Sequence, residues 1–212
     1  MQEQGPDRTD YGARRSADLL RLARTALSGA TAVLARSAAG GEKGMAAVDR
    51  ALGELWETAE DLASTGPAAG VAPEADVRTV ITGMYVGEDV GRMAVLARQV
   101  GDIAWARRSK PPLPASVGDP LRDMGEACLG LIDRAHDSVA SPARGAVTDA
   151  QLADVEDRQE RLCHTLLSGS AALGVMDAVD VAVLGRCYAE CAQRAAAVAA
   201  HVALLRRTAP RG

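Results

Sequence analysis

The sequence predicts an all-α fold of two tandem antiparallel three-helix bundles, with six long helices arranged as in spectrin repeats. Three observations favour this fold: the composition, a motif that occurs twice, and long segments of helical periodicity separated by short breaks. Of the 212 residues, 48% are hydrophobic but only 2% are aromatic, and there is no Phe. Alanine is the best helix former, whereas sheet cores favour Val, Ile, Thr and aromatic side chains. An alanine-rich, aromatic-poor chain is therefore typical of packed helices.

A Glu-x-x-x-Arg motif, followed at a fixed distance by Ala-x-(Gln/His)-Val, occurs twice, about a hundred residues apart. The first copy consists of Glu88, Arg92, Ala97, Gln99 and Val100, and the second consists of Glu190, Arg194, Ala199, His201 and Val202. Each copy lies in a long helical segment. Because this spacing exceeds the roughly 20–50 residues of a solenoid repeat, we interpret it as a duplicated bundle.

The first predicted repeat covers residues 13–108. The preceding residues, 1–12, are polar and contain Gly and Pro, so a disordered N-terminus is predicted there. The first helix is expected to start near Ser16, a good N-terminal cap. A second helix is predicted over 43–64, and a third and longest one over 73–108, where the leading proline is tolerated in the first turn.

A proline-rich linker is predicted over 109–119, between the two halves. The second repeat is predicted over 120–207, and a short tail over 208–212. Thr148 or Asp149 is expected to cap its middle helix. The three helices of this repeat are predicted over about 120–139, 149–167 and 175–207. Short connections inside each half favour antiparallel neighbours.

Three stretches of the chain resemble the PhoU family of bacterial phosphate-signalling regulators. Residues 73–78 resemble Pro-x-Ala-x-Asp-Leu-Arg at the start of the family's third helix. Residues 89–100 and 193–202 resemble its signature, Asp-Leu-Glu-Arg-Ile-Gly-Asp-x-Ala-x-Asn-Ile. The likeness also covers the order and the length of the helices. It implies the PhoU-like architecture of two three-helix repeats.

The resemblance also identifies positions where metal ligands are missing. Family members place Glu and Asp four residues apart on each third helix, where two carboxylates on one face can share a cation. The matching positions here are Gly91 and Val95 in the first half, and Gln193 and Ala197 in the second. None of these side chains is a carboxylate. We therefore expect no metal and no cofactor.

The resemblance implies a non-catalytic, cytoplasmic regulator of phosphate uptake and phosphate-responsive signalling. The implied partners are a sensor histidine kinase and the ATPase subunit of a phosphate ABC transporter, and a homodimer is expected. The net charge of −4 does not favour nucleic-acid binding, and no long apolar run predicts insertion into a membrane. Two alternatives stay open: a metal-binding or ferritin-like helical bundle, and a helical interaction protein unrelated to phosphate.

Glu88 with Arg92, and Glu190 with Arg194, are spaced to form ion pairs along one helix. If exposed, each pair would contribute only about 0.2–0.5 kcal/mol, so solvated surface pairs are one interpretation. The other interpretation is an interaction patch, formed by all four residues, that contacts a partner or an anion.

Gly83, Gly87 and Gly91 lie four residues apart on the predicted third helix. A glycine inside a helix costs about 1 kcal/mol relative to alanine, so three of them indicate a structural requirement. We interpret them as a stripe for close helix packing, either within the bundle or at a dimer contact. A functional hinge is the alternative.

The cysteines are expected to be reduced thiols, because no export signal is recognised. They are Cys128, Cys163, Cys187 and Cys191. We interpret them as buried structural thiols. The alternative is a zinc site formed by Cys163, Cys187 and Cys191 with His164.

Overall fold

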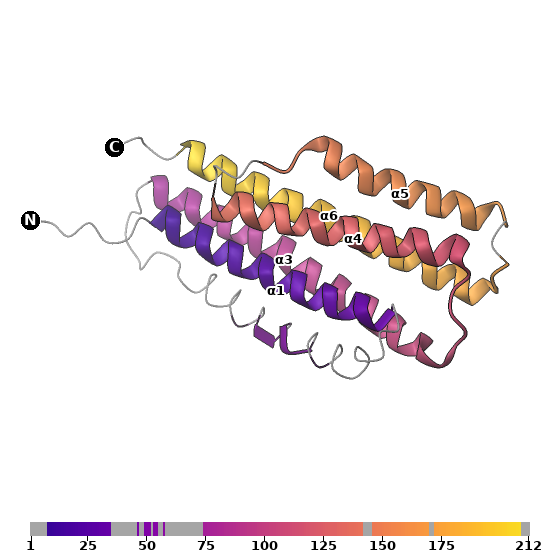
Figure 1. Ribbon diagram of the computed structural model, residues 1–212. Helices are drawn as coiled ribbons and strands as arrows, with labels where there is room; N and C mark the ends of the chain where they lie inside the picture. Colours follow the sequence, from indigo (N-terminus) through magenta and orange to yellow (C-terminus); the bar gives the residue numbers. More distant parts are fainter. Residues whose placement is uncertain are drawn as a thin grey trace, which may run out of the picture.

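All secondary structure in the described residues of the computed structural model is helical. The described residues are 8–34, 46, 49–51, 53–54, 57, 74–141, 146–169 and 172–208. Figure 1 shows the elements α1 (Arg8–Leu34), α3 (Glu74–Ala106), the short 3₁₀ helix η1 (Arg107–Ser109), α4 (Ala115–Ala140), α5 (Asp149–Leu167) and α6 (Val175–Thr208). The predicted all-α helical bundle is thereby confirmed.

The helix predicted over 43–64 lies mostly outside the described residues. The positions that are described within it are helical. Ala51 is buried, and Asp49 forms an ion pair with Arg98 of α3. Asp49 therefore lies beside α3.

Four helices, α1, α3, α6 and α4, form the centre of the molecule. α3 packs against α1 and α6, and α4 packs against α6 and α1. α5 packs on α4 and α6 and forms an outer layer over them (Figure 1). One cluster of buried side chains draws on all five of these helices, so the two predicted repeats share a core.

The core is built from aliphatic side chains at helical spacing. Burying one Leu, Ile, Val or Met contributes about 1.5–3 kcal/mol relative to leaving it exposed. The largest fully buried side chains are Leu19, Leu20, Leu27, Met93, Leu96, Leu121, Met124, Ile132, Leu162, Leu184 and Tyr188. The apolar periodicity gives each helix an apolar side, and burial of these sides against one another joins the helices.

The first helix starts earlier than predicted. α1 begins at Arg8, within the segment 1–12 that was predicted to be disordered. Ser16 is buried inside the helix and does not cap it. Ala13 is also buried, so the additional turns bring apolar surface into the core. This burial favours helix over the disorder that a polar composition indicates.

The linker is also shorter than the predicted 109–119, because α4 begins at Ala115. The amides of Val117 and Gly118 donate to the carbonyl oxygen of Pro114, at 3.0 and 2.8 Å. Val117 is fully buried, which anchors this first turn. Pro120 therefore falls inside the helix, whereas the prediction placed it at the start, where proline is better tolerated.

The remaining helices, α3, α5 and α6, lie close to their predicted bounds. Thr148 is the residue that caps α5, and its backbone amide donates to Oε1 of Gln151 at 3.1 Å. The side chain of the third helical residue thus satisfies an amide at the helix start.

Close helix packing occurs at two glycines that the sequence did not identify. A Cβ at Gly125 of α4 would lie 3.2 Å from Cζ of Tyr188, and a Cβ at Gly185 of α6 would lie 3.0 Å from Cδ2 of Leu162. The hydroxyl of the buried Tyr188 lies 2.9 Å from Oγ1 of Thr31, within hydrogen-bonding distance. These contacts fix α6 against α4, α5 and α1.

Candidate functional site

Helices α3 and α6 pack antiparallel and bring the two motif copies together. Arg92 of α3 donates to Glu190 of α6 from Nε at 2.6 Å and from Nη2 at 3.1 Å. This contact joins the arginine of the first copy to the glutamate of the second. Two parallel, charge-assisted bonds also fix the orientation of both side chains.

Arg194 reaches from α6 to α3, but it binds Asp89 instead of Glu88. Its Nη1 donates to Oδ1 of Asp89 at 3.0 Å, and its Nη2 lies 3.9 Å from Oε1 of Glu190. The side chain of Asp89 is only 8% exposed, whereas Glu88 is exposed. Asp89 therefore supplies the inward carboxylate on α3.

Two further contacts between α3 and α6 are related to each other by the interval between the motif copies. The ring of Tyr85 stacks on His201, with centroids 5.1 Å apart and an interplanar angle of 12°. The thiol of Cys187 donates to Oε1 of Gln99 at 3.4 Å. The interval that separates the two motif copies also separates Tyr85 from Cys187, and Gln99 from His201. The two contacts are thus equivalent, which agrees with a duplication.

We call the polar contacts between these helices the α3–α6 seam, formed by Asp89, Arg92, Glu190, Arg194 and His201. Nε2 of His201 lies 3.6 Å from Oδ2 of Asp89. The hydrogen bond from Arg92 lowers the pKa of Glu190 below its ordinary range, and the same bond raises the pKa of Arg92. The side chains of Arg92 and Arg194 stay 44% and 38% exposed. The seam therefore presents two guanidinium groups to solvent above two shielded carboxylates.

The predicted ion pairs along each helix are replaced by pairs between helices. Glu88 has no ion pair with Arg92, and Glu190 approaches Arg194 only to 3.9 Å. A partner on the facing helix allows two hydrogen bonds to a carboxylate that is partly withdrawn from water. Such a pair is stronger than a solvated one along a single helix.

Two of the three stripe glycines, Gly87 and Gly91, have no close neighbour in the part of the chain that the structure describes. A Cβ at Gly87 or at Gly91 would meet no atom within 4 Å. Among the described residues, packing within the bundle thus does not account for these two glycines. Gly83 is half-buried. A contact with a second molecule stays a prediction for all three.

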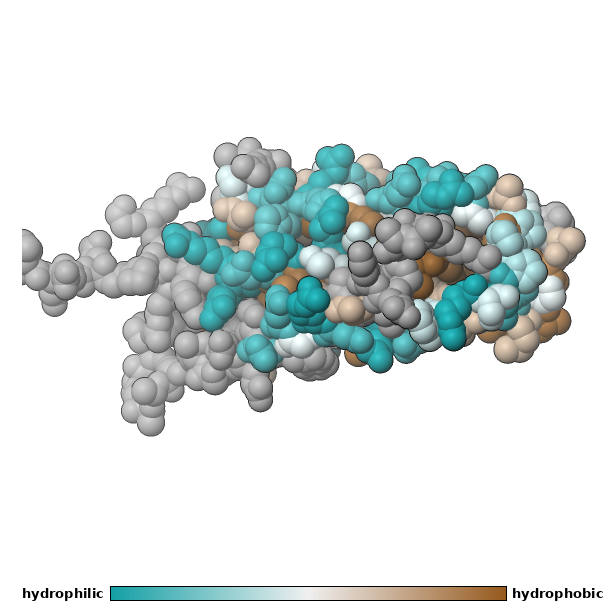
Figure 2. Space-filling view, turned by 60° about the horizontal axis from the view of Figure 1, so that its bottom comes forward, coloured by the Kyte–Doolittle hydropathy of each residue, from teal (hydrophilic) through white to brown (hydrophobic). Residues whose placement is uncertain are grey.

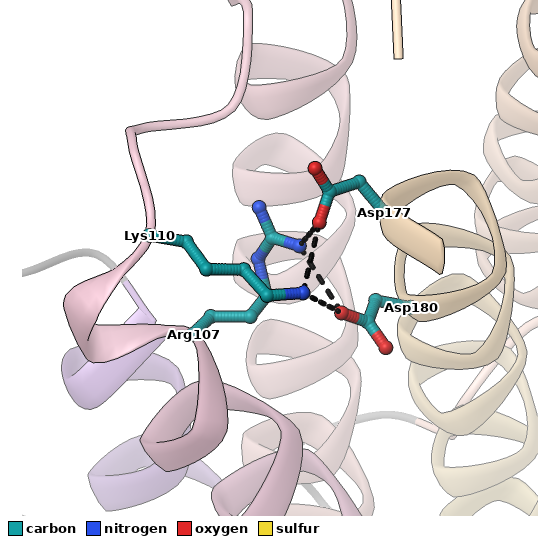
Figure 3. Close-up of polar contacts among 4 residues, drawn as sticks. All are labelled: Arg107, Lys110, Asp177 and Asp180. Atoms are coloured by element: carbon teal, nitrogen blue, oxygen red, sulfur yellow. Dashed lines mark hydrogen bonds and ion pairs between the residues drawn. The ribbon is translucent and has the colours of Figure 1, made fainter. Parts of the chain in front are cut away.

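A second ion cluster, which the sequence did not predict, lies where α3 ends and α6 begins (Figure 3). Nη1 of Arg107 lies 2.5 Å from Asp177 and 3.1 Å from Asp180, and Nζ of Lys110 lies 3.0 and 3.4 Å from the same carboxylates. The Arg107 side chain is only 6% exposed. Hydrogen bonds from Arg107 and Lys110 lower the pKa of Asp177. This cluster ties the linker to the first turns of α6.

The thiols are in the environment predicted for structural cysteines. Cys128, Cys187 and Cys191 are buried, Cys163 is half-buried, and all four are free. Burial raises the pKa of Cys187 to about 11, so the thiol stays protonated at neutral pH. Within the described residues, no group of three or more His, Cys, Asp or Glu side chains is arranged to hold a metal ion.

Figure 2 shows a mainly hydrophilic face with hydrophobic side chains gathered towards one end of the molecule. Ten large hydrophobic side chains are exposed among the described residues. Most belong to two groups, one on α3 and one around the α5–α6 connection. The α3 group is Val77, Ile81, Met84, Tyr85 and Val95, and the other is Leu167, Val175, Met176 and Val179. None of the described helices has the length and apolar character needed to cross a membrane.

The fold and the seam define an all-α helical-bundle protein in which two copies of one motif meet at a single interface. No family model matches the chain. Two proteins named phosphate-specific transport system accessory protein PhoU homolog 2, from Mycobacterium bovis and Mycobacterium tuberculosis, are each 31% identical to it over 143 residues. The matched part is 66% of this chain and 65% of each relative.

A third relative is PhoU homolog 1 of Mycobacterium leprae, which is 30% identical over 145 residues, 66% of this chain and 62% of the relative. The chain thus spans slightly less than two thirds of the length of these relatives. The similarity to these relatives agrees with the resemblance to the PhoU family that residues 73–78, 89–100 and 193–202 carry.

Proposed function

We propose that the protein is a non-catalytic regulator of phosphate uptake and phosphate-responsive signalling. The observation that carries this proposal is the similarity to relatives named as accessory proteins of the phosphate-specific transport system. An accessory role needs a stable surface that another protein can recognise. The α3–α6 seam fits this role, because its side chains are held in fixed positions by contacts between the helices.

The seam residues are the proposed contact points. Arg92 and Arg194 are partly exposed, so each can bind a partner group while it keeps its carboxylate. A guanidinium has five N–H donors, and the contacts to Glu190 and Asp89 use only some of them. Glu88 is exposed beside them and adds an acceptor. The four predicted patch residues thus form the core of the proposed interaction surface.

The proposed partners are a sensor histidine kinase and the ATPase subunit of a phosphate transporter, met in the cytoplasm. Binding of either partner to a rigid face would change the signal only if it favours one state of that partner over another. A homodimer is also part of the proposal, since two copies would present the surface twice and strengthen attachment to a multi-subunit transporter.

The proposal is tested by capture from native cells. The full chain with an affinity tag is expressed from its own promoter in cells grown at high and at low phosphate, and the captured proteins are identified by mass spectrometry. We expect enrichment of the transporter ATPase or the histidine kinase, with a ratio that changes with phosphate. The variant Arg92→Ala/Arg194→Ala should lose this enrichment, while Arg122→Ala, an exposed arginine of α4, should keep it.

Two results would contradict the proposal. One is the absence of both partners from the captured proteins, together with unchanged phosphate uptake in cells that lack the gene. The other is near-stoichiometric iron, manganese or zinc in the purified protein, which would favour a metal-binding bundle instead.

A further inference from the structure

An exposed row of apolar side chains runs along the first half of α3. Val77 and Ile81 are each 46% exposed, Met84 is 69% exposed and Tyr85 is 52% exposed. Their spacing of three to four residues places them on one side of the helix. Isolated exposed apolar residues are common on protein surfaces, but a contiguous row marks a contact site.

The row continues onto α6. Helices α3 and α6 are antiparallel, and Tyr85 of α3 stacks on His201 of α6. The turn that precedes Tyr85 on α3 therefore lies beside the turn that follows His201 on α6. These turns carry Ile81 and Leu204, and Leu204 is 55% exposed. We call Val77, Ile81, Met84, Tyr85 and Leu204 the outer apolar row.

The row ends at the seam, where the exposed side chains are charged: Arg92 and Arg194, with the carboxylate of Glu88 beside them. Arg92 lies two turns beyond Tyr85 on α3, and Arg194 faces it from α6. Arg92 uses Nε and Nη2 for Glu190, so its Nη1 is directed away from that pair. A carboxylate placed over the seam would therefore find guanidinium donors within reach of the apolar row.

The molecule itself shows how a helix covers a pair of its central helices. α5 lies over α4 and α6, and its Leu162 approaches α6 where Gly185 leaves room. Gly91 lies beside open space on α3, since a Cβ there would meet no described atom within 4 Å. It lies two turns beyond Met84, on the same side of the helix as the row.

We propose that the outer apolar row docks an amphipathic α-helix of the partner protein, with an acidic side chain of that helix over Arg92 and Arg194. The apolar side of the partner helix covers the row, and Gly91 permits a close approach of its backbone. The charge of the seam sets the direction of the helix, because only one direction brings its carboxylate to the guanidinium groups. This inference rests on the proposed function and names the way in which the partner binds.

Two pairs of matched variants of the full chain test the docking site. Met84→Glu is compared with Met176→Glu, since both methionines are 69% exposed and Met176 lies at the opposite end of the α3–α6 pair. Gly91→Leu is compared with Gly130→Leu, since neither position has an atom within 4 Å of a Cβ. We expect Met84→Glu and Gly91→Leu to reduce capture of the ATPase or kinase at least about tenfold, and both controls to stay within about twofold.

A photo-crosslinking residue at position 84 identifies what lies on the row. The expected crosslink joins position 84 to a helical segment of the captured partner that carries an apolar side and a carboxylate. A synthetic peptide of that segment should bind the full chain, and replacing its carboxylate by lysine should weaken binding about tenfold or more. Thermal unfolding of each variant verifies that the fold is kept.

The outcomes separate this inference from the proposed function. If the wild-type chain captures neither partner, the function fails and the docking site fails with it. If the wild-type chain captures a partner and both row variants capture it equally well, the docking site is wrong while the function stands. A crosslink from position 84 to a second copy of this chain would show a self-contact and would also overturn the docking site.

Discussion

Helices α3 and α6 carry the same motif, yet the structure uses the two copies differently. In α6, Glu190 faces α3 and its side chain is only 15% exposed, whereas its counterpart Glu88 in α3 is exposed. The neighbouring Asp89 takes the inward role instead. The comparison teaches that a duplicated motif preserves which helices meet, but not which residue of each copy is buried.

The ends of the pair differ as well. Where α3 ends and α6 begins, Arg107 and Lys110 neutralise two aspartates. Towards the start of α3 and the end of α6, the surface instead carries the outer apolar row. Both ends thus expose apolar side chains, Val175 and Met176 at the first and the outer apolar row at the second, but the ion cluster lies at the first.

The largest effect is expected at the end that carries the ion cluster. Arg107→Ala should lower the free energy of unfolding by about 2–3 kcal/mol, because Arg107 is buried and its removal takes charge-assisted hydrogen bonds from Asp177 and Asp180. Lys110 limits the loss, since it contacts both aspartates. Urea unfolding measures the change. Arg108→Ala is the control, since Arg108 is exposed, and an equal loss there would contradict the assigned role.

The next largest effect on stability is expected when a glycine of α6 and a glycine of α3 are each replaced by leucine. Gly185→Leu should destabilise the protein by about 2 kcal/mol, because the added side chain would collide with Leu162 of α5. Gly91→Leu should keep the stability or raise it, since a Cβ there meets no described atom within 4 Å and the helix loses a glycine. Thermal unfolding of both variants decides the point, and a large loss for Gly91→Leu would show that the stripe is packed.

A smaller effect on the free energy of unfolding is expected to distinguish Asp89 from Glu88, the adjacent carboxylates of α3. Asp89→Ala should lower the free energy of unfolding by about 1.5 kcal/mol, the usual scale of a hydrogen bond to a charged group. Glu88→Ala should change it by less than about 0.5 kcal/mol, because this side chain is exposed. The same urea titration compares them. Equal losses of unfolding free energy would mean that Glu88 contributes as much to stability as Asp89 does.

The smallest expected effect is a pH dependence at Glu190. Its pKa is lowered in the folded protein from an ordinary value of 4.5, chiefly by the hydrogen bond from Arg92. Its contribution to stability is therefore complete above pH 4.5 and is lost as the pH falls through the folded-state pKa. Between pH 6 and about pH 3, the urea midpoint of Glu190→Gln should fall less than that of the wild type. If the urea midpoints of the two proteins fall equally over this pH range, the stabilisation of Glu190 by Arg92 is excluded.

Much of the fold could be predicted from the sequence because its determinants are local. Alanine content and apolar periodicity identify helices regardless of their neighbours, and α3, α5 and α6 end close to the predicted residues. The start of α1 was missed because the polar composition of 1–12 indicated disorder, while Ala13, which follows this segment, is buried in the core. The start of α4 was missed because Val117 and its contacts outweigh the position of Pro120.

The site was predictable only in part, because its pairs join residues from opposite halves of the chain. The motif marked the two helices that meet, and four of its residues, Arg92, Glu190, Arg194 and His201, lie in the seam. The choice of Asp89 over Glu88 depends on how α3 is rotated about its axis, and neighbouring residues point about 100° apart. The pairing of Arg107 with Asp177 has no sequence pattern, since it depends on where two helix ends meet.

The burial of the thiols gives this chain a native reporter of opening. Cys163 lies partly in contact with water, while Cys128, Cys187 and Cys191 are enclosed. An alkylating reagent would modify the first in the intact protein and reach the other three only when the helices separate. The time course of their labelling would therefore follow the breathing of the bundle without an added dye or an engineered residue.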